Sequence, residues 1–206
     1  MAPSLLITGC GRSGTTYVSK LLSEAGLELL HHDVGPDGSV DWCLAVTSDV
    51  PLPWGKKGRS SADYVFDRVL HQVRAPLAVI SSSMTIKDRS WDYISNFTSI
   101  EPQDSSIRKS MLYWLEWNRL AEAKADITYR VEQIKDVSTW SALCSVLERP
   151  ELVEQHDTLI GAIASDTNTR RDDYAPLTWD DLRNEDEALT AEILEQAERY
   201  GYSDLV

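Results

Sequence analysis

A glycine-rich stretch near the N-terminus has the residue types and the spacing of an anion-binding loop. The stretch from Leu5 to Gly26 reads LLITGCGRSGTTYVSKLLSEAG, so an apolar run enters a turn and leaves it as an amphipathic segment. Gly9 and Gly14 fit a G-x-x-x-x-G frame, which lets the backbone curl with its N–H groups facing inward. A helix beginning near Thr15 would add the positive end of its dipole. The pattern predicts a loop that holds a phosphate-type group; the alternative is a tight strand-to-helix turn without a ligand.

The charge of this loop sits in an unusual place. Thr15 stands where the lysine of a phosphate-binding NTPase loop belongs, and the positive charge comes instead from Arg12. An arginine three residues earlier is better placed to hold the end of a shorter phosphate group bidentately. The residues that we expect to bind this group are Gly11, Arg12, Ser13, Gly14, Thr15 and Thr16.

The stretch GCGRSGTTYVSKLL resembles the 5′-phosphosulfate loop of the sulfotransferase family, whose loops commonly read [K/R]-S-G-T-[T/S]. The resemblance implies a P-loop fold and 3′-phosphoadenosine 5′-phosphosulfate (PAPS) as the sulfuryl donor, without a required metal. It also implies that Arg12 and the loop amides stabilise the leaving phosphate. The acceptor would be a hydroxyl or an amine on a small molecule or a carbohydrate.

A second part of the resemblance concerns the 3′-phosphate of PAPS. Sulfotransferases typically hold it with an arginine at a strand end and a serine eight residues later, and VRAPLAVISSS supplies Arg74 and Ser82. An arginine at the carboxyl edge of a parallel strand does point into the crevice where such sheets bind ligands. A surface arginine followed by a small helix residue is the alternative. In the segment SDTNTRRDDY, the resemblance implies that Arg170 approaches the same phosphate, unless it is a solvated arginine.

The segment after the first helix supplies the candidates for the catalytic base, which are His32 and Asp33 and, less favoured, His31. Some carbohydrate and tyrosyl sulfotransferases use a Glu or His soon after the loop helix, and here the segment reads LLHHDVG. His32 suits proton transfer at neutral pH, whereas Asp33 would need a pKa raised by burial. The alternative is that they are ordinary polar loop residues. Trp42 is a candidate stacking surface for the acceptor, or a core residue.

The elements that must position these residues follow an alternating pattern. Apolar strand-like runs at 5–8, up to Arg74, and at 126–131 are separated by helical patterns, the clearest at 15–25, 76–84 and 105–125. We expect irregular structure over 31–62, which is rich in Gly, Pro and Ser. The pattern predicts one α/β domain over residues 1–206 with a mainly parallel sheet. The resemblance refines this to a three-layer, P-loop NTPase-like fold.

Composition limits the partners. The chain of 206 residues has a formal net charge of −13, which disfavours binding to nucleic acid or to an anionic membrane surface. The first apolar run is far too short for a signal sequence or a membrane span. Three widely spaced cysteines show no zinc or disulfide spacing. We therefore expect a cytoplasmic protein with no bound metal.

Two other classes of function compete with sulfuryl transfer. A P-loop nucleotide or small-molecule kinase would need a lysine at the Thr15 position and normally an acidic magnesium ligand at a strand end, and neither is evident. A non-catalytic nucleotide-binding relative would be expected to lose Arg12 or Arg74, yet both are present.

Overall fold

A parallel β-sheet forms the centre of the computed structural model, which describes residues 4–53, 58–163 and 175–203. Its five strands lie in the order β2-β3-β1-β4-β5, and all neighbouring strands are parallel. The strands are β1 (Leu5–Thr8), β2 (Leu29–His31), β3 (Gly38–Val40), β4 (Arg68–Val73) and β5 (Ile127–Arg130). Because all strands run the same way, their carboxyl ends meet at one edge of the sheet.

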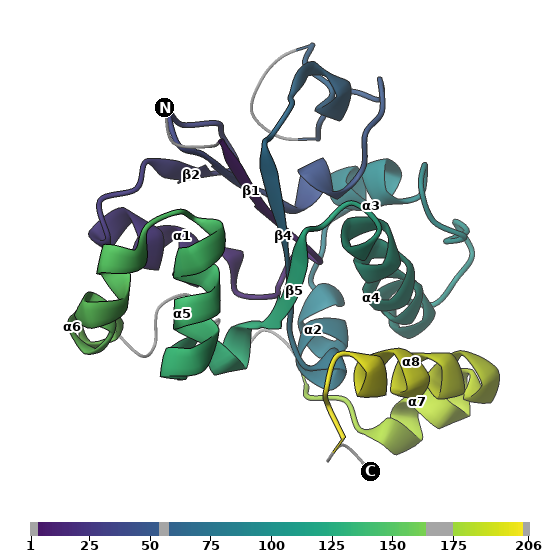
Figure 1. The fold of residues 1–206 in the computed structure, drawn as a ribbon. Helices are drawn as coiled ribbons and strands as arrows, with labels where there is room; N and C mark the ends of the chain where they lie inside the picture. Colours follow the sequence, from purple (N-terminus) through teal and green to yellow (C-terminus); the bar gives the residue numbers. More distant parts are fainter. Residues whose placement is uncertain (1–3, 54–57, 164–174, 204–206) are drawn as a thin grey trace.

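Helices cover both faces of the sheet, which gives three layers (Figure 1). One face carries α1 (Thr15–Glu24), α5 (Val137–Val146) and α6 (His156–Ala162). The other face carries α2 (Pro76–Ser83), α3 (Asp88–Ile94), α4 (Ser106–Glu122), α7 (Trp179–Glu185) and α8 (Glu187–Arg199). Four short 3₁₀ helices complete the described elements: η1 (Trp42–Ala45), η2 (Ser61–Asp63), η3 (Val131–Lys135) and η4 (Pro150–Gln155).

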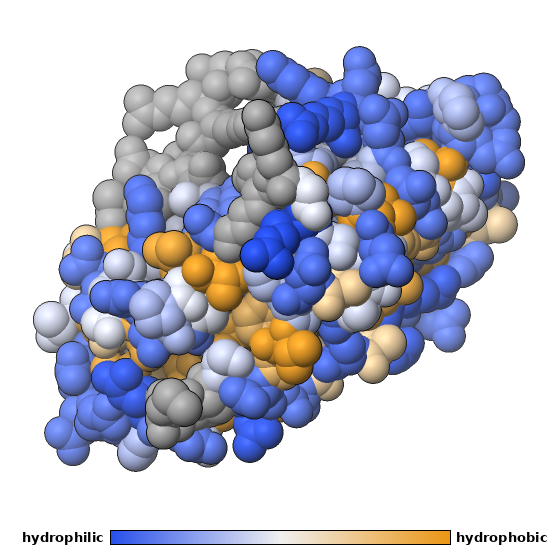
Figure 2. Space-filling view, turned by 90° about the horizontal axis from the view of Figure 1, so that it is seen from above, coloured by the Kyte–Doolittle hydropathy of each residue, from blue (hydrophilic) through white to orange (hydrophobic). Residues whose placement is uncertain are grey.

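Each face of the sheet buries its own apolar core. On the α1 side, Ile7 and Leu70 pack with Trp140 of α5, whereas on the α4 side Val73 packs with Trp114. Strands buried on both faces are continuous apolar runs, as the sequence around Leu5–Thr8 shows. On the molecular face drawn in Figure 2, hydrophilic residues predominate and hydrophobic ones occupy limited areas. No described helix is long and apolar enough to cross a bilayer.

The α/β class and the parallel sheet are confirmed, and the main helices begin and end close to their predicted limits. The prediction of a strand at 5–8 is confirmed, and the helices predicted at 15–25 and 105–125 are observed as α1 and α4. At the start of α7, Thr178 and Asp181 make a reciprocal capping box. The prediction of irregular structure over 31–62 is wrong at β3, because three buried residues pair with β1 although they begin with Gly38.

Gly9, which directly follows β1, lies too close to the backbone of β4 to carry a side chain. Its φ is 154°, and a Cβ at this position would lie 2.1 Å from the carbonyl oxygen of Gln72 on the neighbouring strand. We expect Gly9→Ala to lower the free energy of unfolding by about 2–4 kcal/mol, because β1 and β4 would have to separate. Urea denaturation measures this loss. Gly161→Ala, whose Cβ would meet nothing within 4 Å in helix α6, is the matched control and should lose no stability. Equal stabilities would contradict this explanation.

Candidate functional site

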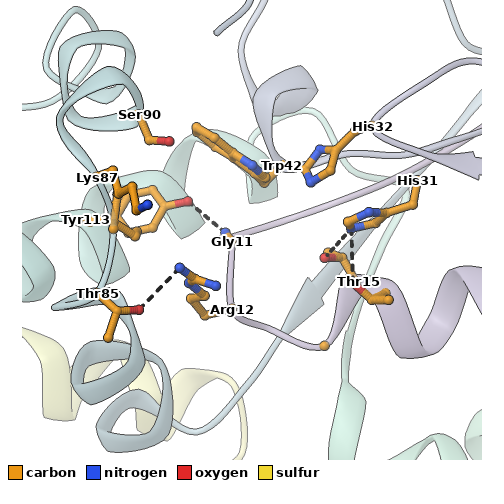
Figure 3. Close-up of a pocket in the computed structure, with 13 residues that line it drawn as sticks. Gly11, Arg12, Thr15, His31, His32, Trp42, Thr85, Lys87, Ser90 and Tyr113 are labelled. Atoms are coloured by element: carbon orange, nitrogen blue, oxygen red, sulfur yellow. Dashed lines mark hydrogen bonds between the residues drawn. The ribbon is translucent and has the colours of Figure 1, made fainter. Parts of the chain in front are cut away.

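A cavity of about 460 Å³ opens at the carboxyl edge of the sheet, beside the Gly9–Thr16 loop (Figure 3). Its walls come from the loop, from the end of β2, from η1, from the α2–α3 connection and α3, and from α4. The loop after β1 and the residues at the end of β2 therefore line the same cavity.

The loop presents open backbone donors at the start of α1. Arg12 and Gly14 adopt left-handed conformations, with φ of 74° and 87°. Gly14 precedes α1 and supplies no side-chain cap, and the N–H groups of Gly14, Thr15 and Thr16 have no acceptor among the described residues. Unpaired N–H groups and the positive end of a ten-residue helix favour an anion at this place.

Residues of β4 and β5 hold the carbonyl groups of the loop and so fix its orientation. The Gln72 side chain donates to the Ser13 carbonyl at 2.6 Å and accepts from the Tyr129 hydroxyl at 2.6 Å. The Arg74 guanidinium donates to the Arg12 carbonyl at 3.0 Å. The N–H after the Ser13 carbonyl, that of Gly14, is left for a ligand, whereas the N–H after the Arg12 carbonyl, that of Ser13, donates to the Cys10 carbonyl at 3.3 Å. The sequence signal for Gln72, which the pattern analysis missed, is a polar residue inside an otherwise apolar strand.

Two residues predicted to hold a second phosphate, Arg74 and Ser82, lie outside the lining of this cavity. No hydrogen bond joins their side chains. Ser82 is buried in α2 and its carbonyl accepts from the Thr85 hydroxyl at 2.8 Å. Arg74 instead supports the loop through the Arg12 carbonyl. The third candidate, Arg170, lies outside the described residues.

The Arg12 side chain turns toward the α2–α3 connection. Its Nη2 donates to the Thr85 hydroxyl at 3.3 Å, and Lys87 and Ser90 continue the same wall of the cavity (Figure 3). Arg12 thus connects the loop to the opposite wall. A guanidinium at this position can reach the outer oxygens of a group whose inner oxygens contact the loop amides.

Tyr113 of α4 lines the cavity beside the loop. Its fully buried hydroxyl accepts a hydrogen bond of 2.7 Å from the Gly11 N–H. Burial raises the pKa of Tyr113 well above its usual range, so the hydroxyl keeps its proton. The ring packs edge-on against Trp42, at 6.2 Å between centroids. Trp42 packs in the core and also lines the cavity, and its role as a stacking surface for the acceptor stays a prediction. Tyr113 lies 102 residues from Gly11, and no local pattern predicts their contact.

His31 belongs to the loop side of the cavity. Its Nε2 lies 3.1 Å from the Thr15 hydroxyl and 3.4 Å from the Thr16 hydroxyl. Burial, with a smaller effect from the adjacent His32, lowers the pKa of His31 to about 4. His31 is therefore neutral at pH 7 and orients the two hydroxyls without adding charge.

His32 has the geometry of a base held by a carboxylate. Its Nδ1 lies 3.3 Å from Oδ1 of Asp41, which is buried and also accepts from the Cys43 N–H at 2.8 Å. His32 lines the cavity. Asp33, the other predicted candidate, is exposed, accepts from the Val34 N–H at 2.7 Å and does not line this cavity. The structure therefore brings His32 into the site and leaves Asp33 outside it.

Asp41 is a site residue that the sequence analysis missed. The pairing of His31 with Val40 in the β2–β3 register sets the next residues, His32 and Asp41, beside each other. The available signal was an aspartate directly before the buried segment WCLA, where it caps η1.

The charge of the cavity is opposite to that of the chain. Arg12 and Lys87 line it, and no carboxylate does so among the described residues, although the chain has 33 Asp and Glu. Nor do the described ranges contain a cluster of three His, Cys, Asp or Glu side chains that could hold a metal ion. The arrangement suits an anion with several oxygens. No known family model matches the chain, and no curated protein matches its sequence significantly.

Proposed function

We propose that this protein is a PAPS-dependent sulfotransferase of the P-loop type. One observation carries the proposal: three open N–H groups of a glycine-rich loop without a lysine face a cavity that an arginine and a lysine line and no described carboxylate enters. Such a loop suits a phosphate bonded to a sulfuryl group rather than a triphosphate spanned by lysine. The resemblance of the RSGTT segment to sulfotransferase loops supports the same substrate.

The residues on the loop would hold the donor substrate. The N–H groups of Gly14, Thr15 and Thr16 would bind its 5′-phosphate, with the threonine hydroxyls oriented by His31. Ser13, also predicted to bind this group, is fully buried and does not line the cavity, and its hydroxyl has no hydrogen-bond partner among the described residues. Arg12 would stabilise the charge that develops on the leaving phosphate oxygen.

His32 would act as the general base, with Asp41 as the residue that positions it. It would take the proton of the acceptor hydroxyl while the new oxygen–sulfur bond forms. The bond between sulfur and the phosphate oxygen breaks, and its electron pair remains on the departing adenosine 3′,5′-bisphosphate (PAP). Binding of the 3′-phosphate by Arg74, Ser82 and Arg170 stays a prediction, and Arg74 would contribute in any case by holding the loop.

Ligand-induced thermal stabilisation tests the function. PAP at about 100 times its Kd should raise the free energy of unfolding by about 2.7 kcal/mol, because it would bind the folded chain alone. Adenosine 5′-monophosphate, which lacks the 3′-phosphate, should raise it less, and ATP with magnesium should have the smallest effect. Stabilisation by ATP with magnesium but not by PAP would favour a kinase. PAP binding without transfer from PAPS to any acceptor would favour the non-catalytic relative.

A further inference from the structure

The wall of the cavity that faces the loop has its own set of polar groups. Lys87 directly precedes α3, Ser90 lies in the first turn of α3, and Tyr113 comes from α4. In Figure 3 these residues lie on one side of Gly11 and Arg12, whereas Thr15 and His31 lie on the other. The cavity therefore has two binding regions. We call the N–H groups of Gly14, Thr15 and Thr16 the amide pole, and the side chains of Lys87, Ser90 and Tyr113 the side-chain pole.

The side-chain pole includes a lysine without a counterion among the described residues. The Lys87 ammonium has no hydrogen bond or ion pair with any described residue, and the Arg12 guanidinium shares the same wall. Two cations in one cavity repel each other, and they also repel a ligand that carries a protonated amine. A ligand with a negative charge between them removes this repulsion. A chain with a net charge of −13 could have supplied a carboxylate here, but none of the described ones lines this cavity.

A hydrogen-bond donor points to the same chemistry. The Tyr113 hydroxyl oxygen accepts from the Gly11 N–H, and its own hydrogen has no acceptor in the part of the chain that the structure describes. Because Tyr113 lines the cavity, this hydrogen can reach a ligand oxygen there. A buried donor without an acceptor is costly, which favours an acceptor oxygen from the ligand.

We propose that the acceptor substrate is a hydroxyl compound that carries an oxyanion, a phosphate or a carboxylate, bound by Lys87 and Tyr113. Its reacting hydroxyl would lie toward His32, along the face of Trp42. The inference rests on the proposed function, and it selects an anionic alcohol over a protonated amine. The sulfuryl group of the donor is the other possible source of an oxyanion at this pole, and the experiment separates the two sources.

Calorimetric titration of inorganic phosphate into protein saturated with PAP, and separately with PAPS, tests the inference. Both nucleotides occupy the loop, but only PAPS fills the place of the sulfuryl group. We expect phosphate to bind both complexes, since the pole would serve the acceptor. Lys87→Gln should weaken phosphate binding at least about tenfold, and Lys87→Arg should weaken it less, because one charge-assisted contact is lost in the first variant and kept in the second.

The controls distinguish failure of the inference from failure of the proposed function. Arg89→Gln removes a neighbouring cation that does not line the cavity, and it should leave phosphate binding unchanged. PAP and PAPS should keep their affinities in Lys87→Gln. If phosphate binds only the PAP complex, the side-chain pole serves the sulfuryl group and the inference is wrong. The inference is also wrong if phosphate binds neither complex. Absence of PAP and PAPS binding to the wild-type protein would overturn the proposed function, and the inference with it.

Discussion

Arg12→Gln should reduce kcat/KM for transfer from PAPS by about 10²–10³-fold or more, the loss typical when a group that stabilises developing charge is removed. Arg12 joins the two poles of the cavity, since its backbone belongs to the loop and its guanidinium contacts Thr85. Glutamine is polar but shorter than arginine, and it has no charge. Initial rates with labelled PAPS measure the effect.

The control for this variant addresses the unusual backbone of Arg12. Its φ of 74° is strained for any residue with a Cβ, so Gln and Lys retain the strain that Arg carries. Arg12→Lys should therefore fold as Arg12→Gln does and regain part of the activity, because it restores charge without the bidentate fork. If Arg12→Gln transfers sulfuryl groups at the wild-type rate, the assignment of Arg12 is wrong.

His32→Asn should lower kcat by about 10²–10⁴-fold, the usual contribution of a general base, and leave the affinity for PAP nearly unchanged. His32 has a φ of 59°, a left-handed conformation that asparagine tolerates well, so the backbone should keep its course. Measuring kcat by initial rates and the PAP affinity by calorimetry separates loss of the base from loss of the binding site.

Two aspartates give the matched comparison for His32. Asp41→Asn should lower kcat less than His32→Asn does, because it weakens the positioning of the ring while the ring itself remains. Asp33→Asn should turn over almost as the wild type does, because Asp33 does not line the cavity. A wild-type kcat in His32→Asn, or a larger loss in Asp33→Asn than in Asp41→Asn, would place the base elsewhere.

Local features of the sequence predicted the parts of the site that are local in the chain. The turn between β1 and α1 follows from glycines between an apolar run and an amphipathic one. These features depend on neighbours in the sequence, where propensity and capping decide the conformation.

The parts that sequence did not predict depend on how strands pair. In the sequence, Asp33 is the acidic residue next to His32. In the structure, the backbone at His32 is left-handed and the chain then leaves the cavity. Asp41, which directly follows β3, lies beside His32 instead, because β3 pairs with β2. β3 has only three residues, too few for a periodic pattern. In the same way, the contact of Tyr113 with Gly11 requires α4 to pack over the sheet, which no nearby residue of Gly11 indicates.

The crystal structure of the protein with PAP tests the central claim most directly, because it shows where the nucleotide's 5′-phosphate lies. We predict its oxygens within hydrogen-bonding distance of the N–H groups of Gly14, Thr15 and Thr16, with the Arg12 guanidinium directed at the same phosphate. A bound PAP whose 5′-phosphate lies away from this loop, with Arg12 turned to solvent, would contradict the account.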